Sequence, residues 1–156
     1  MTLFRLVFSA LEMFSEDLYV FVGDIEMNAA NKQFGIANVL VVDDNVILLR
    51  TVKEMLDSKY NVSIATSGEQ AFKAIERKKP DVILLDYEMP EMNGEEIIIQ
   101  LRENDTTADI PVLFLTSSAN REVVKKLIML NPDGYMLKPP NKQTMIEHIE
   151  EVLCKE

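Results

Sequence analysis

The chain has 156 residues, 47% hydrophobic and 27% charged, a composition that fits one globular domain plus an appendage. The formal net charge of −10 argues against nucleic acid or an anionic membrane as a partner. Cys154 is the only cysteine, which excludes an intrachain disulfide and favours a reducing, cytoplasmic location. Charged residues interrupt the apolar stretch near the start, so neither a signal peptide nor a transmembrane helix is predicted.

Residues 1–37 are predicted to form an N-terminal helical extension. Seven apolar residues alternate at spacings of three and four, which is a heptad pattern. They are Phe4, Val7, Leu11, Phe14, Leu18, Phe21 and Ile25. Such a helix needs a partner surface, so we predict a possible homodimer through this segment. The alternative is that the segment is the remnant of another domain.

From residue 38 to residue 156 the chain alternates between short β-rich runs and longer segments of helical period, which predicts five βα units. The expected strands are 38–42, 61–65, 81–85, 111–115 and 134–137, and the expected helices are 45–58, 68–78, 93–103, 119–130 and 142–154.

The strand compositions predict where each strand lies in the sheet. The first, third and fourth are continuous runs of Val, Ile and Leu, as expected when helices cover both faces. The second and fifth are shorter and more polar, which suits edge positions. We therefore predict the α/β class: a three-layer α/β/α sandwich with a five-stranded parallel sheet of flavodoxin-like order 2-1-3-4-5. Asp44 or Asn45, Ser67 and Asn93 are expected to cap the first three helices.

Polar residues follow four of the apolar runs at the point where each run ends. The pair Asp43 and Asp44 follows the first, Asp86 the third, Thr116 the fourth and Lys138 the fifth. Because ligands of an open parallel sheet bind at the carboxyl ends of the strands, we expect these side chains to converge on one edge. Clustered carboxylates repel one another unless a cation lies between them, and Mg²⁺ is the natural candidate.

The same residues are suited to phosphoryl transfer, which requires positioning and charge neutralisation more than covalent chemistry from the protein. Asp86 could attack phosphorus to give an aspartyl phosphate. Lys138 fits as a cation for one phosphoryl oxygen, and the hydroxyl of Thr116 as a donor to another.

Four motifs occur together, in an order and spacing that resemble a response regulator receiver domain over residues 38–154. They are Val39–Asn45, Asp86–Pro90 with Asn93–Gly94, Leu115–Ser117, and Gly134–Pro139.

The resemblance implies a phosphoacceptor of two-component signalling. Asp86 would receive a phosphoryl group from a histidine kinase or a histidine phosphotransfer protein. Asp43, Asp44 and Asp86 would hold Mg²⁺, and the backbone carbonyl of Glu88 would complete the protein ligands. Lys138 would contact the phosphoryl group, and its peptide bond to the following proline would be cis.

It also implies a conformational switch made of Thr116 and Tyr135, in which the hydroxyl moves to the phosphoryl group while the ring turns inward. Glu88 and Ser118 would tune the lifetime of the phosphoryl group. The domain would remove its own phosphoryl group and would not be a dedicated turnover enzyme. A downstream protein would read the switch on the face built from the fourth helix, fifth strand and fifth helix.

Two alternatives remain at this point. A phosphatase of the haloacid dehalogenase type also uses an Asp nucleophile and Mg²⁺, although it carries an Asp-x-Asp motif, whereas Asp43 and Asp44 are contiguous and Asp86 is separate. A receiver that serves as a scaffold and is never phosphorylated is the second alternative.

Overall fold

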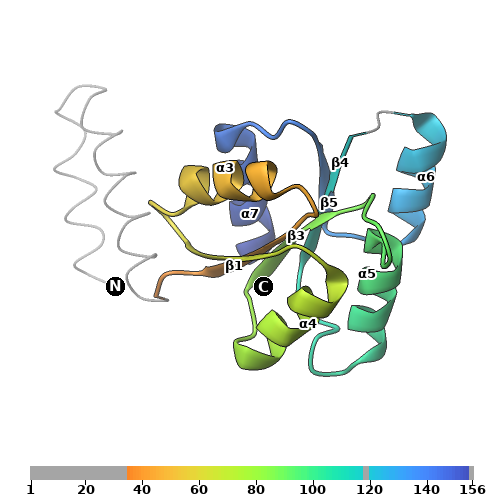
Figure 1. The fold of residues 1–156 in the computed structure, drawn as a ribbon, viewed down its shortest axis with the longest axis horizontal. Coiled ribbons are helices and arrows are strands. Elements are labelled where there is room, and N and C mark those ends of the chain that lie inside the picture. The colour runs from red at the N-terminus through yellow and green to blue at the C-terminus, as the bar shows by residue number, and fades with distance from the viewer. Residues whose placement is uncertain (1–34, 118–119, 155–156) are drawn as a thin grey trace, which may run out of the picture. The chain divides into compact units, whose positions relative to one another are not determined.

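The computed structural model describes residues 35–117 and 120–154 (Figure 1). The described residues from Ala37 onward belong to one compact unit. The predicted N-terminal helix and its homodimer, as well as Ser118, lie outside the described residues and remain predictions.

Five strands alternate with five helices in the described part of the chain. They are β1 (Asn38–Val42), α3 (Val46–Leu56), β2 (Asn61–Ala65), α4 (Gly68–Arg77), β3 (Val82–Asp86), α5 (Gly94–Glu103), β4 (Val112–Thr116), α6 (Arg121–Met129), β5 (Gly134–Leu137) and α7 (Lys142–Leu153).

The strands form one parallel sheet in the order β2-β1-β3-β4-β5, which confirms the predicted flavodoxin-like topology and the edge positions of β2 and β5. Parallel strands need crossover connections, and α3, α4, α5 and α6 supply the four between successive strands, whereas α7 follows the last strand. All five residues of β3 and of β4 are buried, as predicted for continuous apolar runs, whereas most of β2 is exposed.

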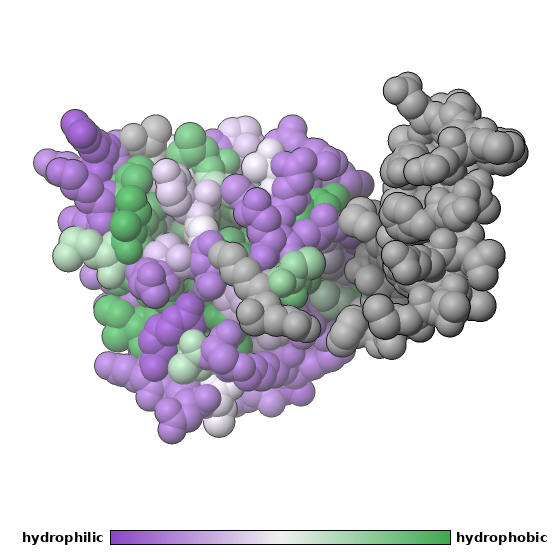
Figure 2. All heavy atoms as spheres, turned by 180° about the vertical axis from the view of Figure 1, so that it is seen from behind, coloured by the Kyte–Doolittle hydropathy of each residue, from purple (hydrophilic) through white to green (hydrophobic). Residues whose placement is uncertain are grey.

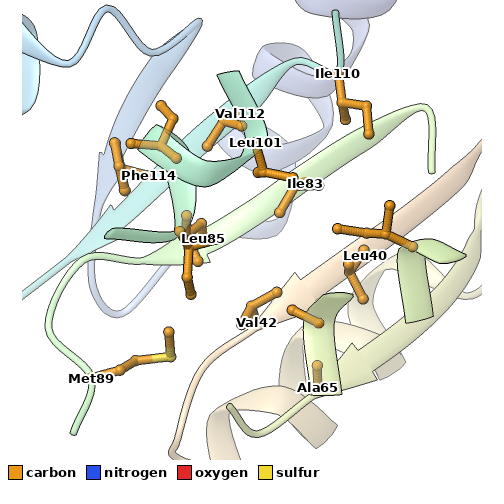
Figure 3. Packing of buried hydrophobic residues seen from close by; sticks show 14 of the residues in the cluster. Leu40, Val42, Ala65, Ile83, Leu85, Met89, Leu101, Ile110, Val112 and Phe114 are labelled. Atoms are coloured by element: carbon orange, nitrogen blue, oxygen red, sulfur yellow. The ribbon is translucent and has the colours of Figure 1, made fainter. Parts of the chain in front are cut away.

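Alternate residues of each strand point to opposite faces of the sheet, so the core has two halves. On one face Leu40 and Ile83 pack with apolar residues of α4, α5 and α6. Figure 3 shows this half, with Phe114 of β4 and Met89 of the loop after β3 at one end. On the other face Val41 packs with α3 and α7. The helices therefore form the two outer layers of the predicted sandwich (Figure 1).

Capping residues set where the helices begin. Asn45 rather than Asp44 caps α3, because its side chain accepts hydrogen bonds from the backbone of Ile47 and Leu48. Ser67 caps α4 as predicted. Asn93 and Glu96 form a reciprocal capping box at the start of α5.

The predicted helix over 119–130 begins later, at Arg121, because Asn120 takes the N-cap position and accepts a hydrogen bond from Glu122. The Lys138–Pro139 peptide bond is cis, as the family resemblance implied.

Polar residues cover much of the face drawn in Figure 2, with apolar residues gathered in smaller patches between them. Within the described residues, no helix has both the length and the apolar character needed to cross a membrane.

Candidate functional site

The carboxyl edge of the sheet carries the residues that the sequence singles out. Asp43 follows β1, Asp86 ends β3 and Thr116 ends β4, and all three are buried. Lys138 follows β5, and its backbone N–H donates to the carbonyl of Thr116 at 2.9 Å. The parallel strand order thus places residues from four separate segments at one edge.

Lys138 bridges two of the carboxylates. Its Nζ atom lies 2.5 Å from Oδ2 of Asp43 and 2.9 Å from Oδ1 of Asp86. Burial alone would lower the pKa of Lys138, but the hydrogen bonds and charges of Asp43 and Asp86 outweigh it and hold that pKa above its ordinary value. The ammonium group therefore stays charged and offsets part of the repulsion between the acids.

The Asp86 carboxyl is held in place by the backbone as well. Its Oδ1 atom accepts a hydrogen bond of 3.1 Å from the N–H of Glu88. Burial raises the pKa of Asp86 above its ordinary value, and the neighbouring Asp43 adds to this, while the contacts from Lys138 and Glu88 oppose it. The ionised form of Asp86 is therefore costly in the folded protein without a further cation.

The three acids meet closely enough to share one ion. Asp43, Asp44 and Asp86 each offer a carboxylate oxygen, and these atoms lie within 4.8 Å of one another. Oδ1 of Asp43 accepts a hydrogen bond of 2.8 Å from the N–H of Asn45, whereas its buried Oδ2 has only the ion pair with Lys138 among the described residues. A set of hard carboxylate oxygens fits Mg²⁺ better than a thiolate-binding or imidazole-binding metal.

An open pocket of about 440 Å³ lies over this cluster. It is lined by Asp43, Asp44, Asn45, Leu48, Asp86, Glu88, Ser117, Lys138 and Pro139. Glu88 is one of the lining residues and is exposed. Sequence reasoning missed Leu48, although its place one helical turn after Asn45 could have indicated the shared face.

The two proposed switch residues differ in exposure. Thr116 is fully buried, whereas 41% of Tyr135 is exposed. Tyr135 lies beside Phe114 in the register of β4 and β5, and Thr116 lies beside Leu137. The side chain of Tyr135 on the edge strand β5 is therefore partly exposed to solvent in this structure.

Gly94 allows the start of α5 to lie directly against Asp86. A Cβ atom at this position would lie 2.5 Å from the carbonyl oxygen of Asp86 and 2.9 Å from Cε1 of Phe114. The N–H of Gly94 donates to the carbonyl of Tyr87, whose ring meets Phe114 edge-on with centroids 5.7 Å apart. A side chain at position 94 would therefore clash with the backbone that carries Asp86.

The strand order and the helical layers define an α/β protein of the flavodoxin-like class. More specifically, the chain belongs to the response regulator receiver domain family, whose sequence model matches residues 39–150. It is thus a receiver domain of two-component signalling. This assignment decides against the haloacid dehalogenase alternative.

Two curated relatives illustrate the range of proteins that contain similar sequences. The nitrate/nitrite response regulator protein NarL of Escherichia coli is 32% identical over 77% of this chain, and hybrid signal transduction histidine kinase D of Dictyostelium discoideum is 32% identical over 71%. The chain spans 56% of the length of the first relative and 7% of the second.

Solved structures agree with the fold. Chemotaxis protein CheY4 of Vibrio cholerae superposes with a TM-score of 0.70 at 29% identity, covering 76% of this chain and 99% of that one. A putative response regulator from Chloroflexus aurantiacus has a TM-score of 0.73 at 24% identity, covering 78% of this chain and all (100%) of that one.

Proposed function

We propose that this receiver accepts a phosphoryl group on Asp86 from the phosphohistidine of a histidine kinase or a histidine phosphotransfer protein, in a Mg²⁺-dependent reaction. The observation that supports this most directly is the meeting of three carboxylates and Lys138 in one open pocket at the carboxyl edge of the sheet. Downstream signalling then proceeds through contacts with a target protein.

Asp43, Asp44 and Asp86, with the backbone carbonyl of Glu88, are the groups that would hold Mg²⁺. When bound, the ion supplies positive charge beside the phosphoryl oxygens. Because Asp43 and Asp86 lie at the ends of β1 and β3, which are neighbours in the sheet, the spacing of these two carboxylates is set by the hydrogen-bonded register, whereas the carbonyl of Glu88 is placed by the loop after β3.

In the proposed reaction a carboxylate oxygen of Asp86 attacks phosphorus and forms an O–P bond. The N–P bond of the donor phosphohistidine breaks, and its electron pair returns to the imidazole ring as the leaving group. The N–H of Glu88 keeps the Asp86 carboxylate oriented toward the pocket. Lys138, already charged and in contact with Asp86, moves its ammonium group onto a phosphoryl oxygen.

Thr116 and Tyr135 would convert the phosphorylation of Asp86 into a conformational change. The hydroxyl of Thr116 donates to a phosphoryl oxygen, and the exposed ring of Tyr135 turns toward the space that the hydroxyl leaves. The downstream protein reads the altered surface of α6, β5 and α7. Attack by water on phosphorus later restores the Asp86 carboxylate and releases phosphate, and Glu88 and Ser118 tune that rate.

The N-terminal segment belongs to the proposal as a dimerisation element. We expect the full chain to have the mass of a homodimer in solution and residues 37–156 to have that of a monomer. A monomeric full chain at moderate concentration would remove this part of the proposal and leave the phosphoryl chemistry untouched.

The decisive experiment is the intact mass of the protein after incubation with Mg²⁺ and a small-molecule phosphodonor. We expect the parent and an Asp105→Asn control, altered at an exposed aspartate, to gain one phosphoryl group each. Asp86→Asn should gain none. Absence of any gain in the parent, and equally in residues 37–156 alone, would favour the scaffold receiver instead.

A further inference from the structure

Gly68 and Met92 form a contact that joins the start of α4 to the loop that follows Asp86. A Cβ atom at position 68 would lie 2.5 Å from Sδ of Met92 and 3.2 Å from its Cγ. The same sulfur accepts a weak hydrogen bond from Nε2 of Gln100 at 3.9 Å. The Met92 side chain therefore rests in the space that any side chain at position 68 would fill.

The loop over residues 87–93 carries the backbone groups that orient Asp86. The N–H of Glu88 donates to Oδ1 of Asp86, and the carbonyl of Glu88 is the backbone ligand proposed for Mg²⁺. Near Glu88 the loop is anchored by Met89, whose side chain is only 8% exposed. Near α5 it is anchored by Met92, which packs against the same core and on Gly68.

We propose that Gly68 is a positioning residue for the phosphoacceptor site, because its missing side chain creates the seat for Met92 and this seat holds the loop that presents Glu88 to Asp86. The inference rests on the proposed function for the role of the Glu88 carbonyl in binding Mg²⁺. Met92 acts through the backbone of the loop, and neither residue contacts the phosphoryl group.

The effect of Gly68→Ala on helix α4 alone would be the opposite of its effect on the site, and this difference allows a test. Gly68 is the first residue of α4, where Gly is a poor helix former and Ala is the best. A purely local role would therefore leave Gly68→Ala with unchanged or higher stability and an unchanged site. If the seat matters, the added methyl group meets Met92 at Cγ as well as at its sulfur, and Cδ1 of Ile97 lies 3.2 Å from the same position. A movement of the flexible tip of Met92 alone then does not make room, and the loop moves whatever stability the helix gains.

The test uses Gly68→Ala, Met92→Ala and the double variant, with Glu76→Ala as a control on an exposed face of α4. Calorimetric titration with Mg²⁺ gives the affinity, and hydrogen exchange by NMR gives the protection of the Glu88 amide. We expect Gly68→Ala to weaken Mg²⁺ binding by about 3- to 10-fold and to speed exchange at Glu88. This loss is smaller than the roughly 10- to 100-fold effect of residues that contact metal ligands directly, because Gly68 acts through Met92 and the loop.

The double variant shows whether Gly68→Ala acts by displacing Met92 or by some other effect on the domain. In the Met92→Ala background the Gly68→Ala change should have at most about a twofold further effect, because the nearest side chain is gone and only Cδ1 of Ile97, at 3.2 Å, remains close. An unchanged Glu88 amide in Gly68→Ala, or a full additional loss in the double variant, would overturn the inference. Failure of the parent to bind Mg²⁺ would instead contradict the proposed function, and the exchange rates would still test the seat.

Discussion

The ammonium group of Lys138 lies 2.5 Å from Oδ2 of Asp43, a buried oxygen of the carboxylate cluster that is suited to a divalent cation. In the metal-free protein the lysine thus compensates charge that Mg²⁺ would otherwise compensate. Lys138 and Mg²⁺ therefore compete for the same carboxylates. A change that removes the lysine charge should lower the stability of the metal-free domain and raise its affinity for Mg²⁺.

Lys138→Met should therefore bind Mg²⁺ more tightly and lose phosphoryl uptake. Removing a unit charge from this site should tighten binding by about tenfold, since such a charge at contact distance is worth at least ~1 kcal/mol. The free energy of unfolding without metal should fall by about 3 kcal/mol, because Asp43 and Asp86 are left buried without their counter-ion.

Calorimetric Mg²⁺ titration and urea unfolding measure these two effects. Lys142→Met is the matched control, because Lys142 is exposed and has no ion pair among the described residues. Weaker Mg²⁺ binding by Lys138→Met would show that the lysine supports the metal site instead of competing with it.

Asp86→Asn should raise the stability of the metal-free domain at neutral pH. The folded-state pKa of Asp86 is raised by burial, so ionisation of this carboxyl costs stability once the pH exceeds the ordinary value of 3.8. The asparagine keeps an oxygen for the Glu88 N–H and carries no charge. We expect a melting temperature higher by roughly 2–6 °C, the shift typical of about 1 kcal/mol in a domain of this size.

The advantage of Asp86→Asn should shrink as the pH falls and should vanish below 3.8, where the parent carboxyl is protonated in both the folded and the unfolded state. Thermal unfolding followed by circular dichroism between neutral and acid pH gives the comparison, with Asp105→Asn for reference. A lower melting temperature of Asp86→Asn at neutral pH would mean that its ion pair with Lys138 outweighs the burial of the charge.

Gly94→Ala should destabilise the domain and slow phosphoryl uptake. Its new methyl group would meet the backbone of Asp86 and Tyr87, which cannot move without shifting the site. Overpacking of this kind costs about 2–3 kcal/mol. In Gly134→Ala the methyl group would meet only Cδ2 of Leu113, the mobile end of a side chain, so we expect a loss below about 1 kcal/mol. Urea unfolding of both variants tests the ranking, and equal losses would contradict it.

The ring of Tyr135 should become less exposed when a phosphoryl analogue is bound. Fluorotyrosine NMR with Mg²⁺ and beryllium fluoride should move the Tyr135 signal while leaving that of Tyr60, which is 6% exposed, in place. Thr116→Val, which removes the hydroxyl and keeps the branched shape, should abolish the shift. A Tyr135 shift that persists in Thr116→Val would show that the ring moves independently of the hydroxyl.

Much of the fold follows from local pattern. Apolar runs at the strands and amphipathic segments between them predict parallel βα units, and the more polar second and fifth strands predict the edges. Residues that follow the runs, such as Asp86 and Thr116, must then gather at one edge of the sheet, because parallel strands all end there. The sequence by itself therefore determined the sheet order and which polar residues gather at this edge, but not the place of Leu48 in the pocket.

Contacts between distant segments were decided only by the tertiary structure. The double ion pair of Lys138 and the seat of Met92 on Gly68 depend on distances that no periodicity encodes. The physical reason is that the spacing of apolar residues in the sequence indicates which face of a helix or strand is buried. A contact between two side chains depends in addition on how two packed faces align. Such alignment is set jointly by every side chain between them.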